Sequence, residues 1–420
     1  MKVAVIGGGS TYAPELIDGF IRDAEKIDLT EVVLMDIDDE RLEVVGNFCK
    51  RMVAHAGNKF KIWGTKDRVE ALKGSDFIIT QIRVGKQIAR HKDIKLGLRH
   101  GLVGQETTGV GGMAKAMRTI PVMRDITEDA KKYAPDAWFI NFTNPSGLIT
   151  ESLHKLGMKK VIGLCNIPIG IVMDLALHLM CDPDRIKIDY VGLNHLGWVR
   201  KIWMDGQDVT ERIVAQLADQ KGPANIPEIN YDPKFTKALG FIPSPYLRYF
   251  YATEEMVRNL QAKDKTRAEE VMEIEDQLLA LYRDPKQVVK PAELDQRGGA
   301  FYSKIAVDLV NTIWNDLNEE HVVNIPNKGA IFGIGEDQTV EIPAIIGRDK
   351  VEAVPVGKVE PKIMGLIQQV KAYETLAVEA GLEGSYDKAL MALVAHPLCP
   401  IEKAREVLDD MIETHDLKLV

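Results

Sequence analysis

Three consecutive glycines separate the first apolar segment of the chain from a segment with helical spacing, in VAVIGGGSTYAPEL. Glycines between a strand and a helix let backbone N–H groups and the helix N-terminus approach a pyrophosphate. The pattern is not a complete GxGxxG, because Tyr12 takes the third position. Asp36 ends the next apolar run, where a carboxylate can accept a hydrogen bond from an adenosine ribose. These features predict an NAD site, although a glycine turn can also be purely structural.

The first 165 residues alternate short apolar runs with longer amphipathic runs. Runs such as VAVI and DFIIT are apolar on both faces, which is typical of parallel strands covered by helices on both sides. We therefore predict an α/β fold whose N-terminal domain, residues 1–165, is a Rossmann-type doubly wound parallel sheet. The predicted strands are Lys2–Ile6, Glu31–Met35, Phe60–Trp63, Asp76–Ile82, Trp138–Phe142 and Lys160–Leu164, and the predicted helices are Pro14–Arg22, Asp39–Ala56, Ala114–Tyr133 and Leu148–Lys155.

The pattern changes after about residue 166. A chain of 420 residues exceeds the ~250–300 of a single core, so a second domain is expected. Residues 189–210 and 330–346 alternate like antiparallel strands, with turn dipeptides such as Asp205-Gly206. These features predict a mixed α+β domain over residues 166–420, as in the lactate and malate dehydrogenases. Its predicted helices are Thr266–Arg283, Ser303–Leu317, Ile363–Gly381 and Ile401–Thr414, and its predicted loop over the site is 218–245.

Composition excludes several classes of protein. The formal net charge of −9 disfavours a nucleic-acid partner, which usually requires a basic face. No segment approaches the ~18 apolar residues of a membrane span, and the N-terminus enters a strand without a leader, so we expect a cytoplasmic protein. The 4 cysteines are too sparse for a disulfide framework, which makes each one a thiol or a ligand.

Cys165 and His195 are the candidate metal ligands. Cys165 ends an apparent strand in KVIGLCN, and ligands of open α/β sheets bind at the carboxyl ends of strands. Taken alone, Cys165 fits a buried core thiol and His195 a hydrogen-bonded core histidine better than a metal ligand. As a pair they are too few for a closed zinc site but suit a metal that keeps positions open for substrate oxygens.

Other polar residues follow predicted strands or lie in aromatic clusters. Asn141 and Asn144 of NFTNPSG would present amides at the same edge of the sheet, or simply begin a turn. Arginine binds phosphate through its forked guanidinium, although a lone arginine is usually a surface charge. The candidate anion-binding arginines are Arg83, Arg90 and Arg297. The candidate cofactor contacts are Gly7, Gly8, Gly9, Ser10, Thr11, Asp36, Arg83 and Asn141.

The motifs GGGSTYAPEL, VGQETTGVGG, NFTNPSG, GLCNIP, GLNHL, SPYLRY and QRGGAFYS follow one another in this order. Together they resemble glycoside hydrolase family 4, and its 6-phospho-β-glucosidase branch in particular. This family is an NAD-dependent exception to the two-carboxylate rule for glycosidases. The resemblance implies hydride removal from carbon 3 of the sugar by NAD⁺, proton abstraction at carbon 2, elimination of the leaving group and addition of water. It also implies a divalent metal, expected to be Mn²⁺, that chelates the sugar oxygens.

The resemblance also implies roles for single residues. Cys165 and His195 match the metal ligands, and Tyr246 of SPYLRY matches the base that removes the proton from carbon 2. A phenol with a reference pKa of ~10 needs nearby positive charge for this role. Asn166 follows the metal cysteine, where phospho-α members have an acid, and it therefore favours a phospho-β substrate such as cellobiose phosphate. The residues matching substrate contacts are Arg90, Asn144, Asn166 and Arg297.

Two alternatives remain open. A malate-type 2-hydroxy acid dehydrogenase would share the cofactor half, but the sequence lacks a clear histidine–glycine base motif for it. A non-catalytic NAD-binding sensor would leave the cysteine–histidine pair unexplained. The family resemblance implies a homodimer or a homotetramer.

Overall fold

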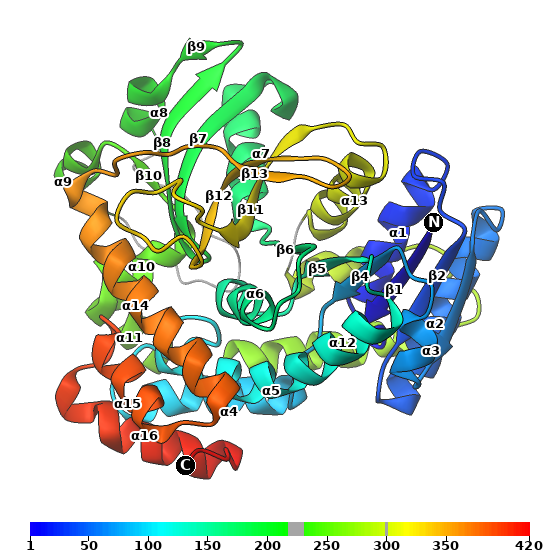
Figure 1. Ribbon diagram of the computed structural model, residues 1–420, viewed down its shortest axis with the longest axis horizontal. Coiled ribbons are helices and arrows are strands. Elements are labelled where there is room, and N and C mark those ends of the chain that lie inside the picture. Colours follow the sequence, from blue (N-terminus) through cyan, green and yellow to red (C-terminus); the bar gives the residue numbers. More distant parts are fainter. Residues whose placement is uncertain (217–230, 299–300) are drawn as a thin grey trace.

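The N-terminal half of the chain forms a parallel sheet with helices on both faces (Figure 1). The computed structural model describes residues 1–216, 231–298 and 301–420. The strands lie in the order β3-β2-β1-β4-β5-β6, which is the order of doubly wound dinucleotide-binding sheets, and the predicted fold is confirmed. Their bounds are β1 Lys2–Ile6, β2 Glu31–Met35, β3 Lys61–Thr65, β4 Phe77–Thr80, β5 Trp138–Asn141 and β6 Val161–Gly163.

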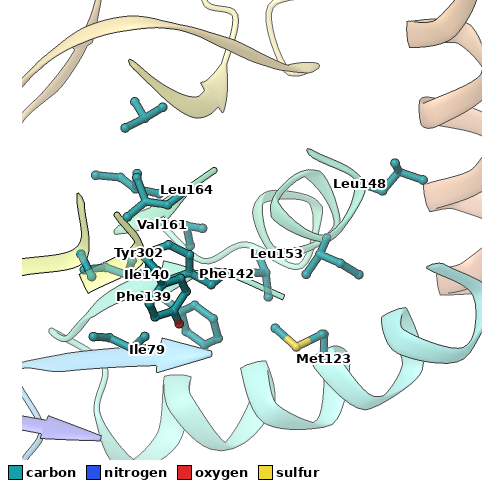
Figure 2. Packing of buried hydrophobic residues seen from close by; sticks show 14 of the residues in the cluster. Ile79, Met123, Phe139, Ile140, Phe142, Leu148, Leu153, Val161, Leu164 and Tyr302 are labelled. Carbon is teal, nitrogen blue, oxygen red and sulfur yellow. The ribbon is translucent and has the colours of Figure 1, made fainter. Parts of the chain in front are cut away.

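Apolar runs place these strands in the interior. All four residues of β4 and of β5 are buried, and only the first residue of β1 is partly exposed. Strand β1 pairs in parallel with β2 on one side and with β4 on the other. Figure 2 shows side chains from the strands packing with others from α5, α6 and α13; those labelled include Ile79, Phe139, Ile140, Val161, Met123, Leu148, Leu153 and Tyr302.

Seven helices connect or flank these strands within the described residues. They are α1 Ala13–Asp23, α2 Asp39–His55, α3 Arg68–Leu72, α4 Lys86–Arg99, α5 Gly109–Tyr133, α6 Ser146–Lys155 and α7 Ile167–Leu179. Asp38 caps α2, because its carboxylate accepts from the backbone N–H of Arg41 at 3.1 Å. The predicted helices are all present, whereas α3, α4 and α7 were not predicted. Helix α4 escaped prediction because it buries polar residues, among them Arg90 and Asp93.

The sheet continues beyond β6 without a break. The antiparallel hairpin of β11 and β12 lies between β6 and β7, so strands from both halves of the chain form one 13-stranded sheet over the described residues. The turn predicted at Asp205-Gly206 joins β8 to β9. Residues 330–338, predicted to alternate as a strand, form turns instead. The remaining strands are β7 Ile186–Leu193, β8 Leu196–Met204, β9 Gln207–Asp208, β10 Ile242–Pro243, β11 Glu319–Pro326, β12 Thr339–Ile346 and β13 Val351–Ala353.

The second half of the chain is rich in helices, and α14, α15 and α16 gather beside α4 and α5 (Figure 1). The α-helices are α8 Thr210–Gln216, α9 Pro233–Leu239, α10 Arg248–Tyr251, α11 Thr253–Gln261, α12 Arg267–Arg283, α13 Tyr302–Trp314, α14 Pro361–Glu383, α15 Tyr386–Ala395 and α16 Ile401–His415. Short 3₁₀ helices span η1 Pro183–Arg185, η2 Pro245–Leu247 and η3 Ala292–Arg297. Of the predicted loop 218–245, residues 218–230 lie outside the described residues, and the rest includes α9 and β10.

Helices of the second half also pack on the first. Ser303 of α13 donates a hydrogen bond to Glu15 of α1 at 2.6 Å, and Arg41 of α2 pairs with Glu275 of α12 at 3.1 Å. The two halves therefore share one interior. In the part of the chain that the structure describes, no helix combines the length and the apolar character needed to cross a membrane.

Candidate active site

Glycines shape the turn between β1 and α1. Gly7 has a φ of +95°, a conformation that residues with a side chain rarely adopt. A Cβ atom on Gly8 would lie 2.7 Å from the Cβ of Leu34, and one on Gly9 would lie 2.9 Å from the carboxylate of Asp36. The turn therefore packs tightly against β2, and no side chain blocks the approach of a ligand from the turn itself. This geometry fits a dinucleotide cradle.

Asp36 is tied to the glycine turn. Its carboxylate accepts from the backbone N–H of Gly9 at 2.8 Å and from that of Asp38 at 3.1 Å. Ser10 is partly exposed beside this turn, whereas Thr11 is fully buried and donates to Glu275 at 3.3 Å. Asp36 and Ser10 thus place polar side chains at the glycine turn, where Arg41 and Gln81 also donate to the carbonyls of Gly9 and Gly7.

The two asparagines of NFTNPSG have different surroundings. Asn141 is fully buried, accepts from Thr80 at 3.0 Å, and donates to Thr150 at 3.1 Å and to backbone carbonyls, so its side chain braces the end of β5. Asn144 is only partly buried, in the loop before α6. The structure therefore leaves Asn144 the more accessible of the two for a ligand.

Cys165 contacts Asn194, the residue before His195, although the two are far apart in sequence. Cys165 follows β6 and is 5% exposed. His195 lies in the tight turn between β7 and β8, where it is 7% exposed and has a φ of +64°. The side chain of Asn194, the residue before it, hydrogen-bonds Cys165. The Nδ1 atom of His195 is buried and has no hydrogen-bond partner among the described residues.

Tyr246 lies against His195. Their rings stack with centroids 3.9 Å apart and planes inclined by 8°. Tyr246 belongs to the 3₁₀ helix η2 and packs in the same buried cluster as Cys165. The two predicted metal ligands and the predicted base thus come from the segment after β6, the β7–β8 turn and η2.

Burial sets the protonation of this group. Burial, assisted by the charge of Lys115, lowers the pKa of His195 to about 3, so its imidazole is neutral at pH 7, which is the form that binds a metal. Burial and the nearby Glu341 raise the pKa of the Cys165 thiol. No group of three or more His, Cys, Asp and Glu side chains converges within residues 1–216, 231–298 and 301–420. The orphaned imidazole nitrogen of His195, the residue after the Asn194 that contacts Cys165, fits a metal completed by substrate oxygens.

A cluster of three cations surrounds Glu106, close enough to His195 for Lys115 and Glu106 to affect its pKa. Arg83 forms an ion pair with Glu106, Arg90 pairs with it at 2.9 Å and Lys115 at 2.9 Å. Burial lowers the pKa of Lys115 to about 7, while the cations overcome burial and hold the pKa of Glu106 well below its usual range. The cluster carries more positive than negative charge and would attract an anionic group. It brings together Arg83 and Arg90, which the sequence assigned to different ligands.

Arg297 lies near the glycine turn, outside the ion pairs of Glu106 but close enough to Arg90 to lower its pKa. It ends η3, donates to Glu275 at 2.9 Å and covers the ring of Tyr12 at 5.3 Å. Asn166 is partly buried and stands at the N-cap of α7, directly after Cys165. Arg297 and Asn166 therefore lie close to the predicted cofactor and metal sites respectively.

Two carboxylates of this region were not predicted from the sequence. Glu106 lies in the glycine-rich motif VGQETTGVGG, which is too unspecific to single out one carboxylate. Glu341 is 1% exposed within β12. A charged residue in a strand that is otherwise mostly apolar was the sequence signal that could have identified it. Burial raises the pKa of Glu341 to about 7, although hydrogen bonds from Asn194, Tyr190 and Asn324 oppose that effect.

The chain is similar in fold to solved structures and in sequence to known proteins. A lactate dehydrogenase from a deep-sea metagenome matches 91% of this chain and 98% of its own at a TM-score of 0.57 and 13% identity, which shows the fold alone. The 6-phospho-β-glucosidase of Thermotoga maritima, solved with manganese, NAD⁺ and glucose-6-phosphate, matches 100% of both chains at a TM-score of 0.92 and 35% identity. A probable 6-phospho-β-glucosidase of Bacillus subtilis is 42% identical over 99% of this chain and 96% of that protein. The 6-phospho-β-glucosidase of Escherichia coli is 39% identical over 99% and 95%.

The fold and the site define a glycosidase built on a dinucleotide-binding sheet. Residues 2–181 match the model of the family 4 glycosyl hydrolases, and residues 190–399 match that of the C-terminal domain of the same family. The chain belongs to family 4 of the glycosyl hydrolases. The resemblance inferred from the sequence is confirmed, and neither the malate-type dehydrogenase nor the sensor is favoured.

Proposed function

We propose that this chain hydrolyses 6-phospho-β-glucosides such as cellobiose 6-phosphate, with NAD and a divalent metal, expected to be Mn²⁺, as cofactors. The observation that carries the proposal is the meeting of Cys165, His195 and Tyr246 beside a cationic cluster. Similarity to known proteins supports it, because relatives named 6-phospho-β-glucosidase are 36% to 42% identical to this chain, whereas a phospho-α-glucosidase and a maltose-6′-phosphate glucosidase of Clostridium acetobutylicum are 32% and 30% identical.

The proposed chemistry assigns the difficult steps to the cofactors and the proton transfer to the protein. When bound, NAD⁺ would take the hydride from carbon 3 and the cation would polarise the oxygens on carbons 2 and 3. Cys165 and His195 would hold the cation, and Tyr246 would then remove the proton from carbon 2. Loss of this proton would expel the leaving group from carbon 1. Water would then add at carbon 1 and a proton at carbon 2, and the hydride would return to carbon 3, which regenerates NAD⁺. The stacking of Tyr246 on His195 would keep its hydroxyl near the bound cation.

The remaining site residues would bind and orient the ligands. The proposed NAD contacts are Gly7, Gly8, Gly9, Ser10, Thr11, Asp36, Arg83 and Asn141. Asn141 would act by bracing its loop. The proposed substrate contacts are Arg90, Asn144, Asn166 and Arg297. The surplus positive charge around Glu106 supports phosphate binding by Arg90. Because Asn166 has no acidic proton to donate, it supports a β-linked substrate.

The activity is tested with p-nitrophenyl β-glucoside 6-phosphate in the presence of NAD⁺ and Mn²⁺. The proposal expects release of nitrophenol without net accumulation of NADH, since the hydride returns to the sugar. The unphosphorylated glucoside and the α-linked phosphate serve as controls and should react far more slowly. Stoichiometric NADH, or equal rates with all three substrates, would refute the proposal.

Assembly and location extend the proposal. We propose a homodimer or homotetramer, measured by light scattering of the purified protein, and a cytoplasmic location, measured by fractionation of the source cells. We also propose that residues 1–165 bind NAD and that residues 166–420 supply most of the metal and substrate site. NAD binding that is weakened by Asp36→Ala but not by His195→Ala would test that division.

A further inference from the structure

A row of four paired residues connects the strand of Cys165 to the hairpin of His195. Gly163 of β6 pairs with Asn324 of β11, Asn324 pairs with Glu341 of β12, and Glu341 pairs with Gly192 of β7. Gly163 lies two residues before Cys165, and Gly192 lies three residues before His195. Strands β6 and β7 do not pair with each other, because β11 and β12 lie between them in the sheet. The spacing of the two proposed ligands therefore depends on this row.

The glycines of the row make room for its polar side chains. A Cβ atom on Gly163 would lie 2.1 Å from the Oγ1 atom of Thr150 and 2.9 Å from the Cβ of Asn324. One on Gly192 would lie 2.1 Å from the backbone oxygen of Leu196. The sheet is thus closely packed at this point, and its inward polar groups have little freedom to move.

Glu341 holds three neighbours through its two oxygens. One oxygen accepts from Asn194 at 3.1 Å and from Asn324 at 2.9 Å, and the other accepts from the hydroxyl of Tyr190 at 2.9 Å. All four side chains are buried. Removing the carboxylate would leave these donors without an acceptor in the interior, which is costly.

Asn194 connects Glu341 to both proposed metal ligands. Its side chain hydrogen-bonds Cys165 and also accepts from the backbone N–H of Gly147 at 3.4 Å. It directly precedes His195, whose φ of +64° is unusual for a residue with a side chain and persists only where the surroundings enforce it. A carboxylate that fixes Asn194 therefore fixes the sulfur and the imidazole together.

We propose that Glu341 is a positioning residue that sets the geometry of the Cys165–His195 metal pair through the side chain of Asn194. The proposal rests on the function proposed above, since it needs these two residues to hold the metal. Partners of metal ligands typically change metal affinity or activity by about 10–100-fold when they are removed. Glu341 would act without touching metal or substrate.

The test measures metal binding directly. Glu341→Gln and Asn194→Ala are titrated with Mn²⁺, with free Mn²⁺ followed by electron paramagnetic resonance, and with Co²⁺, whose thiolate charge-transfer band reports the Cys165 sulfur. Each variant should bind Mn²⁺ about 10–100-fold more weakly and lose intensity in the cobalt band. The double variant should bind no more weakly than the worse single variant, because both changes break one path.

Glu15→Gln is the matched control. Glu15 is also a buried carboxylate with two hydrogen-bond donors, Ser303 and Lys290, and it contacts neither Asn194 nor Cys165 among the described residues. It should leave metal affinity unchanged. NAD binding by each variant reports that the fold is intact, and the hairpin-tip variant Asn194→Ala carries the test if Glu341→Gln does not fold.

Three results separate the possible failures. In the first, Glu341→Gln binds the metal within about threefold of wild type while Cys165→Ser loses binding. That result would overturn this inference and leave the proposed function intact. Weaker binding in Glu341→Gln but not in Asn194→Ala would overturn the path through Asn194. Unchanged binding in both Cys165→Ser and His195→Ala would instead overturn the proposed function.

Discussion

The ring of Tyr246 lies parallel to the ring of His195, with centroids 3.9 Å apart. The contact joins a residue of η2 to a residue of the β7–β8 turn, and it fixes the proposed base relative to a proposed metal ligand. A bound cation near His195 would thus also lie near the phenol and favour its ionised form.

Tyr246→Phe keeps this stack and removes only the hydroxyl. Loss of a general base typically costs about 10²–10⁴-fold in rate, so kcat should fall by that factor while Mn²⁺ affinity stays the same. Steady-state rates with the nitrophenyl substrate measure the effect. Tyr251→Phe is the control, because its hydroxyl accepts from Trp198 at 3.0 Å and takes no proposed part in the reaction. A kcat within threefold of wild type in Tyr246→Phe would exclude Tyr246 as the base.

The sequence predicted the parallel sheet because its strands are apolar on both faces, and β1 and β2 have the predicted bounds. Helix α7 was missed because IPIGIVMDLALHL is apolar nearly all round and shows little helical periodicity. The approach of Cys165 to Asn194 could not be derived from local pattern, since it depends on β11 and β12, more than 100 residues further on. Residue chemistry alone made Cys165 and His195 a candidate metal pair, and the family resemblance then implied their roles.

Removal of the metal should abolish activity. Dialysis against a chelator should silence the enzyme, and Mn²⁺ should restore it. Cys165→Ser should need at least about tenfold more Mn²⁺ for half-maximal rate, since a neutral hydroxyl is a weaker ligand than a thiolate. Cys181→Ser, which alters a half-buried free cysteine, should follow wild type. Full activity after exhaustive chelation would rule out a metal requirement.

Arg90 should govern recognition of the phosphate. Arg90→Gln removes one charge from the cluster around Glu106, and loss of a charge-assisted hydrogen bond of about 1.5–3 kcal/mol would lower kcat/KM for the phosphorylated substrate by about 10–100-fold. The unphosphorylated glucoside should be affected much less. Arg124→Gln, at a partly exposed arginine of α5, provides the comparison. Equal losses with both substrates would indicate a role other than phosphate binding.

Glu275 should make stability depend on pH. Burial opposes its ionisation, but Arg297 and Arg41 outweigh burial and lower the pKa of Glu275 to about 2 from 4.5. A lowered pKa stabilises the fold fully above the unfolded value, and this contribution, about 3 kcal/mol, disappears as the pH falls towards 2. The difference in unfolding free energy between wild type and Glu275→Gln should therefore shrink between pH 4.5 and 2. Urea unfolding measures it, and a difference independent of pH would contradict the ion-pair explanation.

The central claim is that the reaction passes through loss of the hydrogen on carbon 2 of the sugar. The most direct measurement is turnover of the phosphorylated aryl β-glucoside in deuterated water with NAD⁺ and Mn²⁺, followed by magnetic resonance of the product. We predict deuterium at carbon 2 of glucose 6-phosphate. A product formed at full rate with only hydrogen at carbon 2 would contradict the account.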